Sequence, residues 1–184
     1  MAVREILIYP QSKNELRAKS QPVEKIDKSL KHLIADLKDT LQAHENGIGL
    51  ASPQINVHKQ VVIVCLGYEQ EGEWVTGPPE ALINPRVIEA GDERRDFDGC
   101  LSFPGLYGET IRPHLLRVTG LDEQGQPFDR YYEGFNAVVV HHEIDHLEGV
   151  LFIDRVQSAK DLYTLEKNTR GQTIRVPFNA KIPG

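Results

Sequence analysis

The segment VVVHHEIDHLEG, residues 138 to 149, constrains this chain most, because it sets His142 and His146 four residues apart with Glu143 beside the first. On an α-helix, positions i and i+4 lie on one face, so both imidazoles can reach one metal ion while the glutamate points toward the remaining ligand position. We therefore predict a helix that carries two metal ligands, with a metal-activated water and a carboxylate base beside them.

The same segment carries the signals of a helix. Asn136 is expected to cap its start, and Gly149 is expected to end it in the left-handed conformation that glycine adopts at low cost. An apolar stripe is expected to face away from the histidines, formed by Val140, Ile144, Leu147 and Leu151.

Length and composition indicate an ordinary globular protein. The 184 residues are 40% hydrophobic and 26% charged, from which we expect one catalytic domain over residues 1–184. A net charge of −6 gives no electrostatic signature of nucleic-acid or anionic-membrane binding. No run approaches the roughly 20 apolar residues of a membrane span, and no signal peptide is evident, so we expect a cytoplasmic protein without membrane association. The two cysteines, Cys65 and Cys100, argue against a disulfide scaffold.

The first half of the chain predicts one helix and one buried strand. Apolar residues recur at helical spacing through residues 24–45, which predicts an amphipathic surface helix. The next segment, GIGLASPQ at 47–54, is too irregular for either regular element. Residues 61–66, VVIVCL, are continuously apolar and β-branched, as in a buried strand, and we interpret Cys65 within it as a core residue.

The second half predicts strands and a closing helix. The polar stretch 69–80 is interpreted as a surface loop, and residues 122–125 as a hairpin turn. A capping-box spacing predicts a short C-terminal helix over 158–168. The expected strands are 81–91, 115–121 and 128–135. We therefore expect an α+β fold, in which mixed or antiparallel strands pack around a central HExxH helix, with an N-terminal amphipathic helix and a short C-terminal one.

A catalytic site of this kind needs a third protein ligand besides the histidines, since three ligands leave one position open for water. An extension with a third histidine is excluded, because Phe152 stands at its position. Glu166, about twenty residues downstream, is a weaker candidate on a short polar tail. Cys100 is favoured, because the glycines and proline around it in DGCLSFPG form a tight turn that can aim its side chain inward. A thiolate with two imidazoles suits zinc or ferrous iron.

Chance is the competing explanation for each signal taken alone. HExxH recurs in unrelated proteins, and most buried cysteines bind nothing. Chance would have to explain three segments at once, each with backbone-constraining residues around polar groups that suit one site. The combination therefore favours a metal centre.

The three segments resemble the motifs of the peptide deformylases, in the same order: GIGLASPQ, DGCLS and HHEIDH. These metalloenzymes remove the N-formyl group from the initiating methionine of new bacterial and organellar proteins. The resemblance continues through HLEGVLFIDR and implies a hydrolase that acts on N-formylmethionyl peptides as they leave the ribosome, releasing formate. We further expect a monomer with transient ribosome contact and no stable nucleic-acid binding.

The resemblance also implies roles for individual residues. Glu143 would take the proton of the bound water and pass it to the departing amine, while Gln54 and the backbone N–H of Leu101 would hold the formyl oxygen. The metal would be ferrous iron, with zinc, nickel or cobalt in other members. Its ligands would be Cys100, His142 and His146.

Substrate contacts follow from the same resemblance. Gly49 would contact the substrate backbone, and Ile48, Val138 and Val139 would lie near the methionine side chain. Packing of the helix alone explains the two valines equally well.

This sequence departs from the family pattern at four positions. Ser52 stands where alanine is usual and Tyr107 where some relatives have an arginine that holds the substrate backbone. Asp98 replaces a glutamate, so a shorter carboxylate can reposition the Cys100 loop, and His141 replaces a glutamine and adds a proton acceptor with a pH response. Two rivals stay open: a peptide-bond metalloprotease, which would need a longer substrate cleft, and, because of the departures, a metal-bound structural or binding protein that has lost catalysis.

Overall fold

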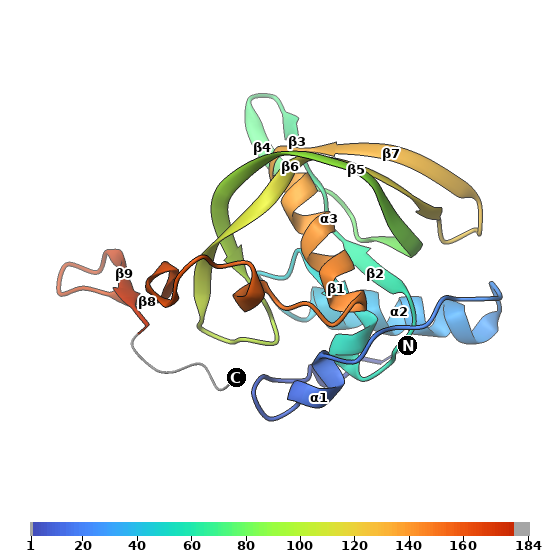
Figure 1. Ribbon diagram of the computed structural model, residues 1–184, viewed down its shortest axis with the longest axis horizontal. Helices are drawn as coiled ribbons and strands as arrows, with labels where there is room; N and C mark the ends of the chain where they lie inside the picture. The colour runs from blue at the N-terminus through green and yellow to red at the C-terminus, as the bar shows by residue number, and fades with distance from the viewer. Residues whose placement is uncertain (1, 179–184) are drawn as a thin grey trace.

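The computed structural model describes residues 2–178, in which a curved antiparallel sheet wraps around helix α3 (Gly134–Leu147) (Figure 1). Helix α2 (Lys28–Gln42) and the short helix α1 (Lys13–Leu16) lie outside it. The class is α+β with few helices and antiparallel strands, as expected. No helix among residues 2–178 is long and apolar enough to cross a membrane.

The main sheet runs in the order β1-β2-β5-β6-β8-β9, and β7 pairs with one end of β6. The longest strands, β5 and β6, form its centre, and each neighbouring pair is antiparallel. Its strands are β1 (Gly49–Ala51), β2 (Val61–Val64), β5 (Glu80–Gly99), β6 (Tyr107–Leu121), β7 (Pro127–Glu133), β8 (Leu162–Lys167) and β9 (Thr173–Pro177).

Strand β2 separates two apolar clusters, which explains why it has no polar face. Val61 and Ile63 pack into the cluster that contains the buried side of α2, whereas Val62 and Val64 pack into the cluster that contains α3. Side chains alternate between the two faces of a strand, so a strand covered on both sides is apolar throughout. Cys65 is half-buried against the α2 cluster, as expected of a core residue.

The amphipathic segment 24–45 contains α2, which is shorter than expected. Asp27 ends the preceding coil, and its carboxylate accepts the backbone N–H of Leu30 at 2.9 Å, so the helix begins one residue later. The buried face consists of Leu30, Ile34, Leu37, Thr40 and Leu41.

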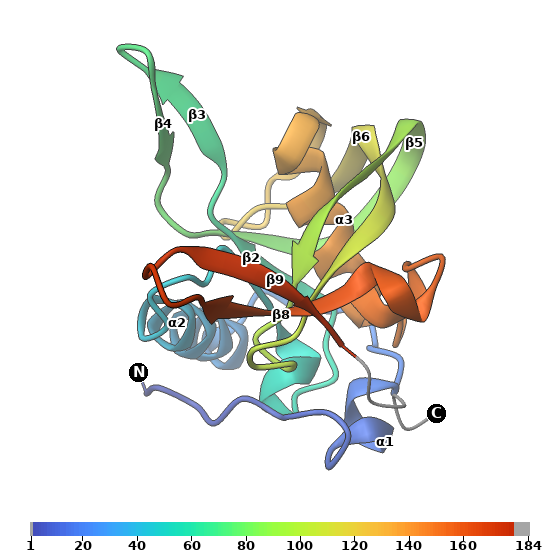
Figure 2. The same ribbon diagram turned by 90° about the vertical axis from the view of Figure 1, so that its left-hand side faces the viewer.

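The expected surface loop at 69–80 is wrong, because this segment contributes to a hairpin of β3 (Gly67–Gln70) and β4 (Glu73–Thr76) that projects from the body (Figures 1 and 2). Glu71 and Gly72 connect the strands with φ of 53° and 82°, the two left-handed residues of a type I′ turn. Asparagine or aspartate usually precedes the glycine in such turns, so the Glu71-Gly72 pair was not recognised as a hairpin turn in the sequence.

The expected C-terminal helix over 158–168 is also wrong. The capping box exists, since Ser158 accepts the N–H of Lys160 and Asp161 accepts the N–H of Ser158. It caps only the 3₁₀ turn Ala159–Asp161, after which β8 pairs with β6 and β9. Tertiary strand pairing overrides the local helix signal here.

Helix α3 ends as expected but begins differently. At its end, Gly149 has φ of 72° and the N–H of Val150 bonds the carbonyl of Asp145 at 3.0 Å, which is a Schellman motif. A side chain at Gly149 would also meet the carbonyl oxygen of Arg17 at 2.2 Å. Asn136 does not cap the start; its amide bonds both backbone groups of Gly67, at 2.8 and 2.7 Å, and ties the projecting hairpin to the helix.

The segment 47–54 is more regular than expected, because it forms β1 and most of a 3₁₀ turn (Ser52–Ile55).

The strands expected in the second half of the chain are confirmed. The expected strands at 81–91, 115–121 and 128–135 fall within β5, β6 and β7, apart from the last two residues, which enter α3. Residues 122–125 connect β6 to β7, with the Asp122 carboxylate accepting the N–H groups of Gln124 and Gln126.

Candidate metal centre

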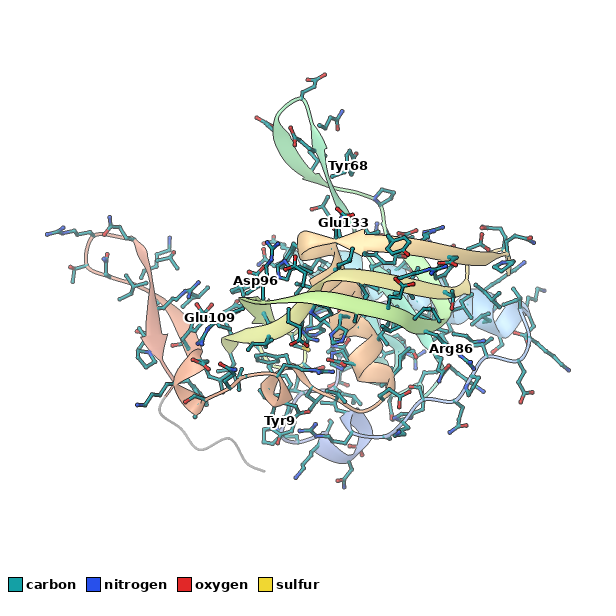
Figure 3. The ribbon with its side chains drawn as sticks, turned by 45° about the horizontal axis from the view of Figure 1, so that its top comes forward. Tyr9, Tyr68, Arg86, Asp96, Glu109 and Glu133 are labelled. Carbon is teal, nitrogen blue, oxygen red and sulfur yellow. The ribbon has the colours of Figure 1, made fainter. Side chains whose placement is uncertain are left out.

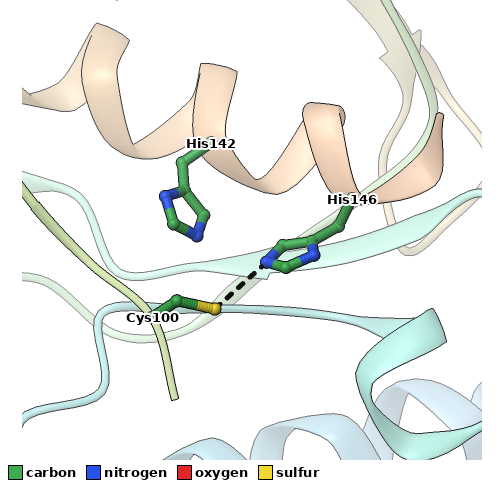
Figure 4. A group of neighbouring side chains, drawn as sticks. All are labelled: Cys100, His142 and His146. Carbon is green, nitrogen blue, oxygen red and sulfur yellow. Dashed lines mark hydrogen bonds between the residues drawn. The ribbon is translucent and has the colours of Figure 1, made fainter. Parts of the chain in front are cut away.

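Three side chains from two elements converge at one point (Figure 4). His142 and His146 project from α3, and Cys100 follows the end of β5; one ligand atom from each lies within 4.8 Å of the others. The Cys100 Sγ lies 3.4 Å from His146 Nε2. A tetrahedral metal with bonds of about 2.0–2.3 Å separates its ligand atoms by roughly 3.3–3.8 Å. The group therefore fits a single metal ion, and the structure brings together the three expected ligands.

Asp98 orients the first histidine. Its Oδ1 lies 2.7 Å from His142 Nδ1, which leaves Nε2 of that ring for a metal. Its Oδ2 accepts from Arg112 Nε at 2.7 Å and from Thr110 Oγ1 at 2.9 Å. Burial alone would raise the pKa of Asp98, but the attraction of its carboxylate to His142 and Arg112 is stronger and holds that pKa well below its usual range. The shorter carboxylate thus still reaches the histidine.

Arg112 was not identified from the sequence, yet it connects both halves of the site. Its side chain is fully buried, and besides Asp98 it binds Asp145 on α3, with Nη1 to Oδ2 at 2.7 Å. Arg155 binds the same aspartate. The sequence carried no signal for it, because the expected strand began at residue 115; the structure extends β6 to residue 107 and places Arg112 on its buried face with Thr110. A charged residue on a buried strand face requires buried partners.

His141 contacts Arg112 and is not one of the three side chains of the metal group. Its Nδ1 lies 2.8 Å from Arg112 Nη1, so the ring accepts a hydrogen bond there. Burial, only partly offset by Asp145, lowers the pKa of His141 to about 4. The ring is therefore an uncharged acceptor at neutral pH, and the expected pH response lies well below neutrality.

Glu143 is a buried carboxylate beside the three ligands. It is 5% exposed, burial raises its pKa to about 7, and its Oε2 has no hydrogen-bond partner among residues 2–178. A Cβ atom on Gly49 would lie 2.2 Å from Glu143 Oε1. Glycine at position 49 is therefore what allows the carboxylate to lie against β1.

Gln54 has one amide orientation that its contacts favour. Its Oε1 accepts the N–H of Ala51 at 2.8 Å, so Nε2 points toward Cys100 Sγ at 3.5 Å and Ser102 Oγ at 3.1 Å. An amide donor is thus directed at the metal group. Ser52 is fully buried, and its hydroxyl donates to the carbonyl of Lys59, away from these groups.

A cleft of about 910 Å³ opens onto this group. His146 is 1% exposed and lies behind the lining. Val139 both lines the cleft and packs into the α3 cluster, so its two interpretations coexist. The other residues to which the resemblance assigns a metal, catalytic or substrate role line the cleft: Ile48, Gly49, Gln54, Cys100, Leu101, Val138, His142 and Glu143.

Glu166, the weaker candidate for the third ligand, does not join the two histidines. Glu166 lies exposed in β8, and it is absent from the metal group found among residues 2–178. Phe152, at the position of a third histidine, is buried and packs edge-on against Phe103 with ring centroids 5.1 Å apart.

Residues 3–161 match the family model described as polypeptide deformylase. The chain belongs to the polypeptide deformylase family. The peptide deformylase of Phenylobacterium zucineum (strain HLK1) is 40% identical over 168 residues, which are 91% of this chain and 95% of that one. That of Saccharophagus degradans is 42% identical over 161 residues, covering 87% of this chain and 88% of the relative.

Solved peptide deformylases share the fold. The enzyme from Ehrlichia chaffeensis superimposes with a TM-score of 0.78 at 31% identity, covering 87% of this chain and 91% of that one. A Met-Ala-Ser-bound structure of the class I type b enzyme from Acinetobacter baumannii gives 0.75 at 27% identity, covering 84% and 99%. This deformylase is therefore an enzyme that removes the N-formyl group from nascent polypeptides, and the resemblance seen in the sequence is confirmed.

Proposed function

We propose that this deformylase holds one divalent metal through Cys100, His142 and His146 and hydrolyses the formyl amide of N-formylmethionyl peptides with Glu143 as its base. The observation that carries the proposal is the buried Glu143 carboxylate, which lines the cleft beside Cys100 and His142 and has one oxygen without a hydrogen-bond partner among residues 2–178. Ferrous iron is the proposed metal, with zinc, nickel or cobalt able to replace it. When bound, the metal supplies Lewis acidity, which lowers the pKa of a water and polarises the formyl group.

Glu143 moves the proton in this scheme. Its carboxylate accepts a proton as water attacks the formyl carbon, and it delivers that proton to the amine nitrogen as the C–N bond breaks. The products are formate and a free amino terminus. Gly49 supports this role, because its missing side chain leaves room for the carboxylate.

Two donors hold the formyl oxygen as negative charge develops on it. Gln54 supplies Nε2, whose direction is set by the Ala51 N–H bond to Oε1, and Leu101 supplies its backbone N–H beside Cys100. A donor preorganised for an oxyanion contributes about 3 kcal/mol to transition-state stabilisation.

The substrate lies with its methionine side chain against the apolar part of the cleft, formed by Ile48, Val138 and Val139. Its backbone runs past Gly49. Because the family acts on new polypeptide chains, we place the enzyme in the cytoplasm, as a monomeric single domain that contacts the ribosome transiently.

The direct test compares formyl-Met-Ala-Ser with unformylated Met-Ala-Ser. We expect formate from the first peptide and no cleavage of the second. Internal cleavage without formate would instead identify a peptide-bond metalloprotease, and metal binding without any hydrolysis would identify a binding protein. Elemental analysis of protein purified without oxygen identifies the metal.

Two substitutions separate the base from the ligands. Glu143→Ala is expected to keep the metal while kcat falls by about 10²–10⁴-fold, the range for loss of a general base. Cys100→Ala is expected to lose the metal itself. Glu148→Ala is the matched control, since Glu148 follows α3 and forms an exposed ion pair with Lys19. Wild-type turnover in Glu143→Ala would refute the base assignment.

A further inference from the structure

The geometry points to Leu165, on the C-terminal hairpin β8–β9, as part of the outer wall of the substrate cleft, which makes the enzyme prefer an apolar or aromatic residue after the methionine. This inference rests on the proposed function of the cleft. The hairpin begins at Leu162, immediately after residues 3–161 that match the family. This part of the wall is thus supplied by a segment outside the matched region.

Continuity of the cleft is the first observation. The same cleft is lined by Glu143 at its inner end and by Leu165 of β8 at its rim. Phe97 and Leu165 are exposed to 38% and 41%, although both are large apolar side chains. Apolar surface at the mouth of a substrate cleft favours burial of an apolar substrate group.

A row of aromatic rings joins this rim to the sheet. Phe97 of β5 stacks on Tyr107 of β6 with ring centroids 5.5 Å apart, and Tyr107 stacks on Tyr163 of β8 at 6.4 Å. Tyr163 and Leu165 share one face of β8, because alternate residues of a strand point the same way. Phe97, Tyr107 and Leu165 all line the cleft, so its rim offers apolar and aromatic surface.

Ion pairs fix the hairpin against the central strands. Glu109 of β6 accepts from Arg95 of β5 and from Arg175 of β9, each at 2.6 Å, and Arg95 also pairs with Asp161. Arg175 in turn lies over the Tyr163 ring, 4.5 Å from its centroid. Figure 3 labels Glu109 at the base of the hairpin. None of these four charged residues lines the cleft, whereas Phe97, Tyr107 and Leu165 do, so we assign the selection of the substrate residue to those three.

The occupant of the rim is the peptide segment that follows the methionine. An extended chain advances about 3.3 Å per residue, so the residues after a methionine held at the inner end lead outward along the cleft. A side chain from one of the next two residues is placed to pack on Leu165, Phe97 and Tyr107.

The experiment measures selectivity with two peptide series, formyl-Met-X-Ala and formyl-Met-Ala-X, where X is Phe, Leu, Ser, Asp or Lys. We expect kcat/KM for Phe or Leu to exceed that for Ser by about 10-fold at one of the two positions, mainly through KM, as partial burial of a large apolar side chain predicts. A ratio of kcat/KM values does not depend on how much enzyme is active, so it is insensitive to partial misfolding.

Leu165→Glu is expected to reduce that ratio to near one, and Leu165→Ala to reduce it several-fold. The matched control is Ile174→Glu. Ile174 is 42% exposed in β9 of the same hairpin, but it pairs with Glu166 and so faces away from Leu165. Thermal unfolding and metal content are compared for all three variants.

The outcomes separate the two proposals. No formate from any peptide rejects the proposed function of the cleft. Formate release with equal kcat/KM for Phe and Ser at both positions leaves that function intact and overturns the hairpin inference. Equal loss of preference in Ile174→Glu and Leu165→Glu also overturns it, because the effect would then belong to hairpin stability. Loss confined to the Leu165 variants supports it.

Discussion

Arg112 and Arg117 lie in the same strand, β6, and each pairs with two carboxylates, but only the first does so out of contact with water. The Arg112 side chain is 0% exposed, whereas that of Arg117 is 32% exposed and reaches Glu89 and Asp129 on the outer surface. Removing one partner of a buried ion pair leaves an uncompensated charge, while exposed pairs are solvated and screened. Although each arginine has two carboxylate partners, removing Arg112 is therefore expected to destabilise the protein far more than removing Arg117.

The largest effect is expected for Arg112→Met, which leaves Asp98 and Asp145 buried without their shared cation. Loss of one buried partner typically costs about 3–5 kcal/mol, so we expect the free energy of unfolding to fall by that amount. Urea unfolding of the metal-loaded protein measures it. A stability equal to wild type would show that Arg155 alone compensates Asp145 and would break the contrast.

An intermediate effect is expected for Asp98→Asn. The asparagine keeps the size of the side chain but loses the charge that fixes His142 through Nδ1 at 2.7 Å. Loss of such a partner typically lowers metal affinity by about 10–100-fold. Competition with a chromophoric chelator measures the affinity. Asp129→Asn is the control, because it removes a carboxylate from the exposed pair of Arg117, and it should leave metal affinity unchanged.

The smallest effect is expected for Arg117→Met. Water solvates the Glu89 and Asp129 carboxylates that it leaves behind, so unfolding in urea should match wild type at high salt, where screening already weakens the pairs. The substitution also removes the guanidinium that lies over the exposed Tyr131 ring, 5.5 Å from its centroid, a contact worth little in water. Destabilisation as large as that of Arg112→Met would contradict the role given to burial.

A second contrast, between local signals and long-range contacts, explains which parts of the fold could be predicted from the sequence. The apolar run of β2 and the turn at 122–125 carry local signals, and the structure has both. The hairpin β3–β4 and the strand β8 do not, since one uses a glutamate in its turn and the other forms by pairing with β6 and β9. Long-range pairing is invisible to a local pattern.

Within the site, the motifs found in the sequence contain the residues that meet at the metal group. Arg112 was missed, because its partners lie 14 and 33 residues away and no spacing rule connects them. Asn136 was misassigned for the same reason: its partner is Gly67, 69 residues earlier, rather than its own helix. Leu165, at the rim of the cleft, belongs to the segment for which a helix was wrongly expected.

Cys100 and His146 are 46 residues apart, and only the pairing of β5 with β6 around α3 brings them within 3.4 Å. An unfolded chain has no preformed binding site of this shape, so metal capture follows folding. The visible absorption of a cobalt–thiolate bond would then act as a reporter of native topology. During refolding it should rise with the slowest step that assembles the sheet and helix, after helical circular dichroism has begun to recover.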